Sequence, residues 1–447
     1  MRKFPINSRS ILYSLLLLSA ASCKKFVDVK PTGQTTKAIT FESVENAAGA
    51  VNGMYFDLSI QGNIYSLLLY TNISLLADEL NTVNVAAAPF AVNSVTPQLS
   101  GLTVYWSGYY AMINHANLVL DNLSSVPGLP AAQMAAWKAE AKFIRATAYM
   151  GLVQLFGKVP KVTSSAWHDN ETLPRSPVTD IYALIVQDLK DAAAGLPHDY
   201  GDPAINRIRA TKGAANAMLT KCYMLQKDWT NAAASATAVI DDAAMYQLEP
   251  VFDDVFTDNS VESILEIWFG SLAPSILSSS FGQGGGRGST PQYTPGAKIV
   301  SAFNNSPNDA RSFKSIGGGK VNKYATSTSR PKLLRLGDLY LLRAEAKTQL
   351  NDLTGGLNDL NTIRTRAGVD SSTASDQASL LLAIENERYL ELAFEGQRWF
   401  DLIRTGRADA VIGALKPATW QPTDVLLPVP QTEINANPAL LPQNPPF

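Results

Sequence analysis

The chain has very few of the residues that build redox or metal chemistry, with two cysteines and three histidines among 447 residues. His115, His168 and His198 lie far apart, and none shares a metal-ligand spacing with a cysteine or an acidic residue. We therefore expect no metal centre. Cys222 lies in an apolar helical stretch, where a small buried side chain is its ordinary role.

A membrane-spanning segment is also missing from the start of the chain. The apolar run Ile11 to Leu18 is shorter than the roughly 20 residues that a spanning helix needs. It follows Arg2-Lys3 and ends in small residues before Cys23, which is the pattern of a secretory signal peptide over residues 1–22. The flank resembles a bacterial lipobox, with Ala20 in place of the usual leucine. We predict lipidation of Cys23 and membrane attachment through this N-terminal lipid. An ordinary signal peptide with an unremarkable cysteine is the alternative.

Positive charge is not in excess either. The formal net charge is −2, and removal of the signal peptide would take away three basic residues and leave a more acidic chain. Without a basic cluster to neutralise phosphates, nucleic acid is not an expected partner. The glycine runs 284–286 and 317–319 lack the Lys-Ser or Lys-Thr of a phosphate loop. No Gly-x-Ser-x-Gly elbow occurs. We predict no cofactor.

Helical periodicity dominates what is present, as in the apolar stripe Val178, Tyr182, Ile185, Leu189, Ala192, Leu196. Residues 210–240 and 334–367, the second with a turn expected at Gly355-Gly356, have the spacing of tetratricopeptide-like helical hairpins. Each hairpin buries one face, so several must stack. We predict an all-α-dominated fold, tetratricopeptide-like hairpins stacked with an irregular, loop-rich part. The single domain, 23–447, would comprise a helical scaffold (about 40–240 and 330–410), an irregular insertion (about 241–329) and an extended C-terminal tail (411–447).

Several segments resemble a known family in the same order along the chain. The run Glu387 to Arg404, with the sequence ERYLELAFEGQRWFDLIR, resembles the most recognisable segment of the SusD/RagB family. Leu427 to Pro430 and Gln443 to Pro445 resemble its closing motif, with Pro446-Phe447 where Gly-Tyr is commoner. Upstream, Ala139 to Ala146 resembles the family's first strong helix. The resemblance spans nearly all of the mature chain.

The resemblance implies a SusD-like fold and a nutrient-binding lipoprotein on the surface of the cell outer membrane. It further implies a SusC-like TonB-dependent transporter as partner and a glycan or oligosaccharide as ligand, or a peptide in some members. In the family the helical part is expected to face the transporter while the irregular part carries the ligand. Two other classes stay open, an enzyme that acts on glycans and a tetratricopeptide scaffold without a small ligand. We expect a binding protein and not an enzyme.

Aromatic and amide side chains of the irregular segments are the best candidates for a ligand site, because sugar rings stack on flat aromatic rings while their hydroxyls bind polar groups. Trp106 and Trp268 lie within apolar runs and are assigned to packing. Loss of a ring from an open site should weaken binding with little loss of stability. The candidate ligand-binding residues are Asn81, Asn84, Phe90, Phe281, Gln283, Arg287 and Tyr293.

Acidic residues occur in two noticeable groups. Glu387, Glu391 and Glu395 repeat every four residues among arginines, a spacing that favours ion pairs that fix helix packing. Glycosidases instead need two carboxyls that face each other across a sugar, roughly 5 to 9.5 Å apart. Asp78-Glu79 is expected to be a solvated helix end. We therefore assign no catalytic residue.

Overall fold

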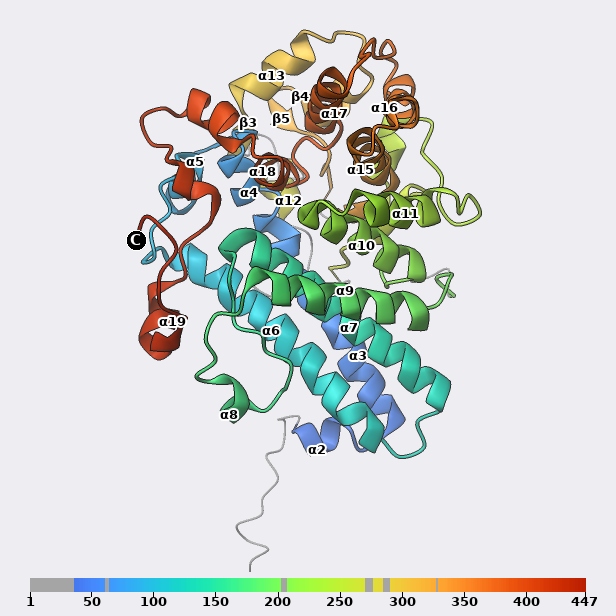
Figure 1. Cartoon of the computed structure of the whole chain (residues 1–447), viewed down its shortest axis with the longest axis vertical. Helices are drawn as coiled ribbons and strands as arrows, with labels where there is room; N and C mark the ends of the chain where they lie inside the picture. Colours follow the sequence, from blue (N-terminus) through green and yellow to red (C-terminus); the bar gives the residue numbers. More distant parts are fainter. Residues whose placement is uncertain (1–35, 61–63, 202–206, 270–275, 284–289, 327–328) are drawn as a thin grey trace, which may run out of the picture.

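The computed structural model describes residues 36–60, 64–201, 207–269, 276–283, 290–326 and 329–447. The predicted signal peptide, Cys23 and Arg287 lie outside these residues. Helices dominate the described chain, as predicted (Figure 1). None of the described helices is long and apolar enough to cross a bilayer.

The first layer of the fold is built from α3 (Val44–Ile60), α6 (Ser100–Asn122), α7 (Ala131–Phe156) and α9 (Val178–Gly195). Helix α7 packs between α6 and α9 and is buried on most of its surface. Arg145 of α7 joins the three helices, because its guanidinium donates to Asp188 of α9 at 2.8 Å and to Asn117 of α6 at 2.8 Å. The predicted apolar stripe of α9 is the face that it buries.

Both predicted helical hairpins are confirmed. They are α10 (Lys212–Gln226) with α11 (Trp229–Ile240), and α15 (Leu336–Gln349) with α16 (Leu353–Arg366). The two turns use the same device. A residue with positive φ, Lys227 or Asn351, ends the first helix, and an aspartate then caps the second.

The hairpins stack because α9 packs on α10 and α11 on α15, so that the helices form one continuous series (Figure 1). Helix α17 (Gln377–Glu391) covers α15 and α16. The turn predicted at Gly355-Gly356 is wrong, since both glycines lie in the first turns of α16. A Cβ at Gly356 would lie 2.3 Å from the Thr348 hydroxyl, so this glycine allows close packing of the two helices.

The described residues form three two-stranded antiparallel sheets, and two of these sheets join segments that are distant in the sequence. Strand β1 (Leu80–Thr82) pairs with β3 (Tyr293–Pro295), and β4 (Ile316–Gly317) pairs with β5 (Lys320–Val321). Strand β2 (Ser263–Glu266), which lies in the predicted irregular insertion, pairs with β6 (Lys332–Arg335). Because β6 leads directly into α15, this pairing joins the irregular segment to the hairpins.

The remaining elements are short. The segment predicted to be irregular contains brief helices, and the C-terminal tail runs along one side of the molecule (Figure 1). The tail was predicted to be extended, but parts of it are helical, because prolines begin helical turns at Pro422 and Pro438. The short helices are α2 (Lys37–Thr40), α4 (Asn72–Leu76), α5 (Ala88–Ala91), α8 (Trp167–Asn170), α12 (Leu277–Ser280), α13 (Ala297–Asn304), α14 (Arg311–Ser315), α18 (Arg398–Arg404) and α19 (Gln431–Ala436), and single turns at Ile64–Leu68, Val85–Ala87, Leu123–Ser125, Phe252–Phe256, Asp409–Gly413, Pro422–Val425 and Pro438–Leu440.

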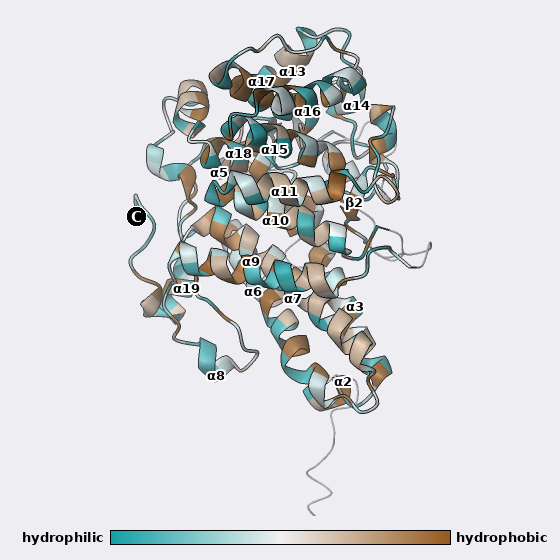
Figure 2. Cartoon of the chain, turned by 45° about the vertical axis from the view of Figure 1, so that its right-hand side comes forward, coloured by the Kyte–Doolittle hydropathy of each residue, from teal (hydrophilic) through white to brown (hydrophobic). Residues whose placement is uncertain are grey.

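The apolar core is continuous from α3 through the hairpins to the C-terminal tail. A smaller cluster fills the space between α15, α16 and α17, with Leu341, Leu360 and Ile384 at its centre. The helices carry both hydrophobic and hydrophilic residues along their length (Figure 2). This pattern is expected of helices that bury one face and expose the other.

Candidate functional site

The β1–β3 pair brings together candidate residues that are about 200 positions apart in the sequence. Asn81 lies opposite Thr294 and Thr82 opposite Tyr293. The Asn84 amide donates to the Gln292 side-chain carbonyl and to the Tyr293 hydroxyl, each at 3.4 Å. The structure thus places Asn81, Asn84 and Tyr293 in one antiparallel pair.

Amide and hydroxyl groups line this pair. The Asn81 amide donates to the Pro295 carbonyl at 3.3 Å, and the Thr82 hydroxyl donates to the Gln292 carbonyl at 3.1 Å. Asn81 and Gln292 are exposed, while Thr82 and Asn84 are half-buried. We call Asn81, Thr82, Asn84 and Gln292 the polar ribbon. Thr82 and Gln292 were not predicted, because only the register of β1 with β3 reveals that they belong to it.

The aromatic candidates do not line an open surface. Phe90 and Phe281 are 0% exposed and Tyr293 is 3% exposed. Phe281 stacks on Tyr324 with ring centroids 5.8 Å apart and meets Tyr293 edge-on at 6.3 Å. The expectation that these rings are open to a ligand is wrong, because the β1–β3 pairing closes their segments onto the core. Phe281, Tyr293 and Tyr324 form an aromatic layer within the core near the polar ribbon, whereas Phe90 packs against Tyr105 with ring centroids 6.2 Å apart.

Gln283 is half-buried and joins the end of α12 to the β4–β5 hairpin. Its amide donates to the Asn322 side-chain carbonyl at 2.7 Å, and Asn322 in turn donates to the Phe313 carbonyl at 3.1 Å. Lys320 adds a third link by donating to the Gly282 carbonyl at 2.7 Å. Arg287, the remaining candidate, is outside the described residues.

Of the two tryptophans that the sequence assigned to packing, only one is buried. Trp106 is buried and packs against Phe156 with ring centroids 5.2 Å apart, as predicted. Trp268 was also assigned to packing, but it is 42% exposed. Phe313 of α14 was not singled out and is 73% exposed. Its short helix has no periodic pattern that could have shown which way the ring points.

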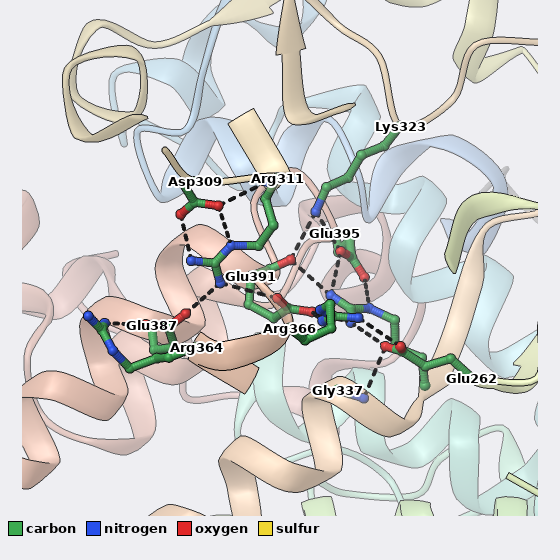
Figure 3. A network of polar contacts seen from close by, with 11 residues as sticks. Glu262, Asp309, Arg311, Lys323, Gly337, Arg364, Arg366, Glu387, Glu391 and Glu395 are labelled. Atoms are coloured by element: carbon green, nitrogen blue, oxygen red, sulfur yellow. Dashed lines mark hydrogen bonds and ion pairs between the residues drawn. The ribbon is translucent and has the colours of Figure 1, made fainter. Parts of the chain in front are cut away.

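The repeated glutamates belong to a buried network of ion pairs (Figure 3). Glu391 accepts from Arg335 at 2.6 Å, from Arg366 at 2.5 Å and from Arg311 at 3.2 Å. All four side chains are almost fully buried. Ion pairs were predicted here, but the arginines of Glu391 come from β6, α16 and α14 and not from its own helix. The charges of the network balance, with five carboxylates, Glu262, Asp309, Glu387, Glu391 and Glu395, and five cations, Arg311, Lys323, Arg335, Arg364 and Arg366.

Two acidic residues differ from their predicted setting. Helix α17 ends at Glu391, so Glu395 lies beyond it, after Phe394 at φ +64°. Glu79, expected at a solvated helix end, is 0% exposed and accepts from the Phe394 amide at 3.3 Å. Burial raises the pKa of Glu79 from 4.5 to about 7, although the hydrogen bond from the Phe394 amide and the positive charges of Arg398 and Lys323 oppose the change.

Metal chemistry has no candidate cluster in the part of the chain that the structure describes, where no three His, Cys, Asp or Glu side chains could hold an ion. Cys222 is buried in α10, and burial raises the pKa of its thiol to about 12. Its thiolate is therefore not formed near neutral pH.

Comparison with known proteins agrees with the resemblance seen in the sequence. The SusD family model matches residues 289–447, and a model described as "Starch-binding associating with outer membrane" matches residues 25–224. SusD-like protein P25 of Formosa agariphila is 26% identical, with 96% of this chain and 97% of that protein aligned.

Solved structures show the same fold. A SusD homolog from Bacteroides thetaiotaomicron has a TM-score of 0.83 at 21% identity, covering 94% of this chain and 100% of that one. A laminarin-binding SusD-like protein has a TM-score of 0.76 at 22% identity, covering 91% and 100%. Together the two family models cover most of the chain, and the chain belongs to the SusD/RagB family.

Proposed function

We propose that the protein is a lipid-anchored binding protein of the bacterial outer membrane that captures a glycan at the polar ribbon and passes it to a SusC-like TonB-dependent transporter. The observation that carries the proposal is the ribbon itself. In a chain of this family, exposed Asn81 and Gln292 lie beside half-buried Asn84 over a fixed aromatic layer.

The chemistry of the ribbon suits a neutral sugar. Amides offer both donors and acceptors, which match hydroxyl groups that also do both. Val83 and Val85, 73% and 86% exposed, supply apolar surface next to these amides. The four ribbon residues are uncharged, so recognition would depend on hydrogen bonds and shape. A laminarin-binding relative with the same fold supports a glycan as the ligand class.

The setting of the buried carboxylates also favours a binding protein over a glycoside hydrolase. Glu387 and Glu391 are each held by two or more arginines inside the network, and they are 1% and 0% exposed. Such groups can neither reach a sugar nor exchange a proton freely with it. The absence of turnover during prolonged incubation with a bound glycan is the expected result.

Ligand binding tests the ribbon directly. Isothermal titration with laminarin, starch and peptide pools should identify a binding glycan, and the Asn81→Ala/Gln292→Ala double variant should bind it about 5- to 140-fold more weakly. This corresponds to the loss of two neutral hydrogen bonds, each contributing about 0.5–1.5 kcal/mol. Gln133→Ala, an exposed amide of α7, is the matched control and should bind like the unmodified protein. Equal affinity of the double variant would remove the ribbon from the site.

The anchor and the transporter need separate tests. Cys23→Ala should leave a folded protein that moves from the membrane fraction to the soluble fraction, because acyl chains are the proposed attachment. Metabolic labelling with a fatty acid provides the measurement, and retention of the variant without label would contradict lipidation.

Native extraction in mild detergent should recover a TonB-dependent barrel bound to the surface of the α10–α11 and α15–α16 hairpins. Repeated absence of such a barrel would argue against delivery.

A further inference from the structure

A cavity lies between α11, α15, α17 and α18, away from the polar ribbon. Its volume is about 580 Å³, and no ribbon residue lines it. Trp229 and Leu382 supply apolar surface, and Leu382 is 49% exposed. The charged residues of the lining are Lys227, Glu345, Glu385, Arg388, Arg398, Asp401, Arg404 and Arg407. A volume of several hundred Å³ with a few convergent polar groups is typical of small-molecule sites.

In one part of the cavity lining, each charged side chain is already paired with an opposite charge. Arg404 donates to both carboxylate oxygens of Glu345, at 2.5 and 2.7 Å, and to Asp401 at 2.9 Å. Arg388 donates to the other oxygen of Asp401 at 2.8 Å. These pairs hold α15, α17 and α18 together, and their charges satisfy one another. They form a fixed wall and leave little capacity for a ligand.

The other part of the lining carries more positive than negative charge. Arg398 and Arg407 share a single carboxylate, Glu385, at 3.5 and 2.9 Å. The side chain of Arg398 is only 7% exposed, and its guanidinium lies over the Tyr389 ring, 4.5 Å from the centroid. Of the five N–H donors of a guanidinium, Arg398 directs one to Glu385. Exposed Lys227 also lines this cavity.

A neighbouring lysine adds to the positive charge around the two arginines. Partial burial lowers the pKa of Lys298 on α13, the charges of Arg398 and Arg407 also lower it, and the charges of Asp78 and Glu385 raise it.

We infer that this cavity binds a small carboxylate whose body is partly apolar, with the acid group on Arg398 and Arg407 and the body against Trp229 and Leu382. A planar guanidinium matches a carboxylate in both charge and geometry. Tyr389 already holds Arg398 in place, so little side-chain freedom is lost on binding. The acid could be a sugar acid or an apolar organic acid, since both present the same group.

Titration of the purified full-length protein with three probes distinguishes a sugar acid from an apolar organic acid. Tri-galacturonate carries carboxylates on sugar rings, N-acetylleucine carries one on an apolar body, and galactotriose is a neutral sugar of similar size to the first. At least one acid should bind, galactotriose should not bind in this cavity, and affinity for the acid should fall as NaCl rises. The acid that binds more tightly identifies the ligand class.

Variants then locate the site. Arg398→Gln and Arg407→Gln should each weaken acid binding about tenfold or more. Arg407 is 42% exposed, so its variant remains informative if Arg398→Gln folds poorly. Lys190→Gln, an exposed cation on α9, is the control and should change nothing. Asn81→Ala/Gln292→Ala should also leave acid binding intact, which separates this site from the proposed glycan site. The inference is overturned if neither acid binds below about 10 mM, if the neutral sugar competes equally, or if Arg407→Gln binds the acid unchanged.

Discussion

Replacement of Glu391 by alanine should destabilise the protein more than replacement of any exposed glutamate. Glu391 is 0% exposed and lies within hydrogen-bond distance of Arg311, Arg335 and Arg366, at 3.2, 2.6 and 2.5 Å. Burial alone would raise the pKa of Glu391, but the positive charges of Arg366, Arg335 and Arg311 lower it well below its ordinary value of 4.5. Its contribution to stability is therefore complete above about pH 4.5 and is lost only as the pH falls through the lower folded value.

The magnitude follows from the charge balance of the network. With five carboxylates against five cations, removal of Glu391 leaves one positive charge uncompensated where Arg335 is 1% and Arg366 5% exposed. Breaking a buried pair in this way costs about 3–5 kcal/mol. Unfolding entropy is about 2.1 cal/mol/K per residue, so for about 400 ordered residues the Tm should fall by about 4–6 °C. Salt should change this little, because buried pairs are weakly screened.

Thermal and urea unfolding at pH 7 provide the assay. Glu391→Gln preserves the side-chain volume and removes the charge, so it should lose nearly as much stability as Glu391→Ala. Glu171→Ala is the control, since Glu171 is 43% exposed and its ion pair with His168 is long, at 3.8 Å. This variant should change the free energy of unfolding by less than about 1 kcal/mol. A stable glutamine variant beside an unstable alanine variant would show that packing and not charge is responsible. Loss of less than about 1 kcal/mol in both would refute the reasoning.

Two further predictions concern buried groups near the polar ribbon. Glu79→Gln should be about 3 kcal/mol more stable than the unmodified protein at pH 8 but not at pH 4, because a folded pKa of about 7 against an ordinary 4.5 lowers stability as the pH rises through this interval. If urea unfolding showed the same pH dependence of stability for Glu79→Gln and for the unmodified protein from pH 4 to 8, this prediction would be contradicted. Phe281→Ala should cost about 3–5 kcal/mol of unfolding free energy, since the ring is 0% exposed and leaves a cavity. A normal urea midpoint for this variant would instead restore the view that its ring is open.

Helices and their pairing could be predicted because the information is local. The apolar stripe of α9 repeats every three or four residues, and the α10–α11 hairpin is marked by small residues on both sides of a Lys-Asp-Trp turn. The second hairpin shows the limit. Glycine usually indicates a turn, but Gly356 is inside α16 because Thr348 of the facing helix leaves no room for a side chain.

The candidate site was harder to predict because exposure is a property of the tertiary fold. Phe281 and Trp268 both lie in the irregular segment, yet the first is fully buried and the second is 42% exposed. No local pattern distinguishes them. Asn81 and Asn84 became candidates from their residue type alone, whereas Gln292 becomes a candidate only because the β1–β3 pairing brings it next to Asn84.

The ion-pair network links stability to the proposed binding role. From β3, the chain continues through α13 to Asp309 and Arg311, and Arg311 is held by Glu387 and Glu391 of α17. The segment that follows Gln292 of the polar ribbon is therefore fastened to the helical scaffold through buried charges, 16 residues after β3 ends. These pairs are costly to desolvate, and an apolar contact of the same size would often stabilise as much. Charged groups with fixed hydrogen-bond geometry, however, allow few alternative arrangements. Such a network would hold an irregular segment in one position against the hairpins, which is what a preorganised ligand site on short strands requires.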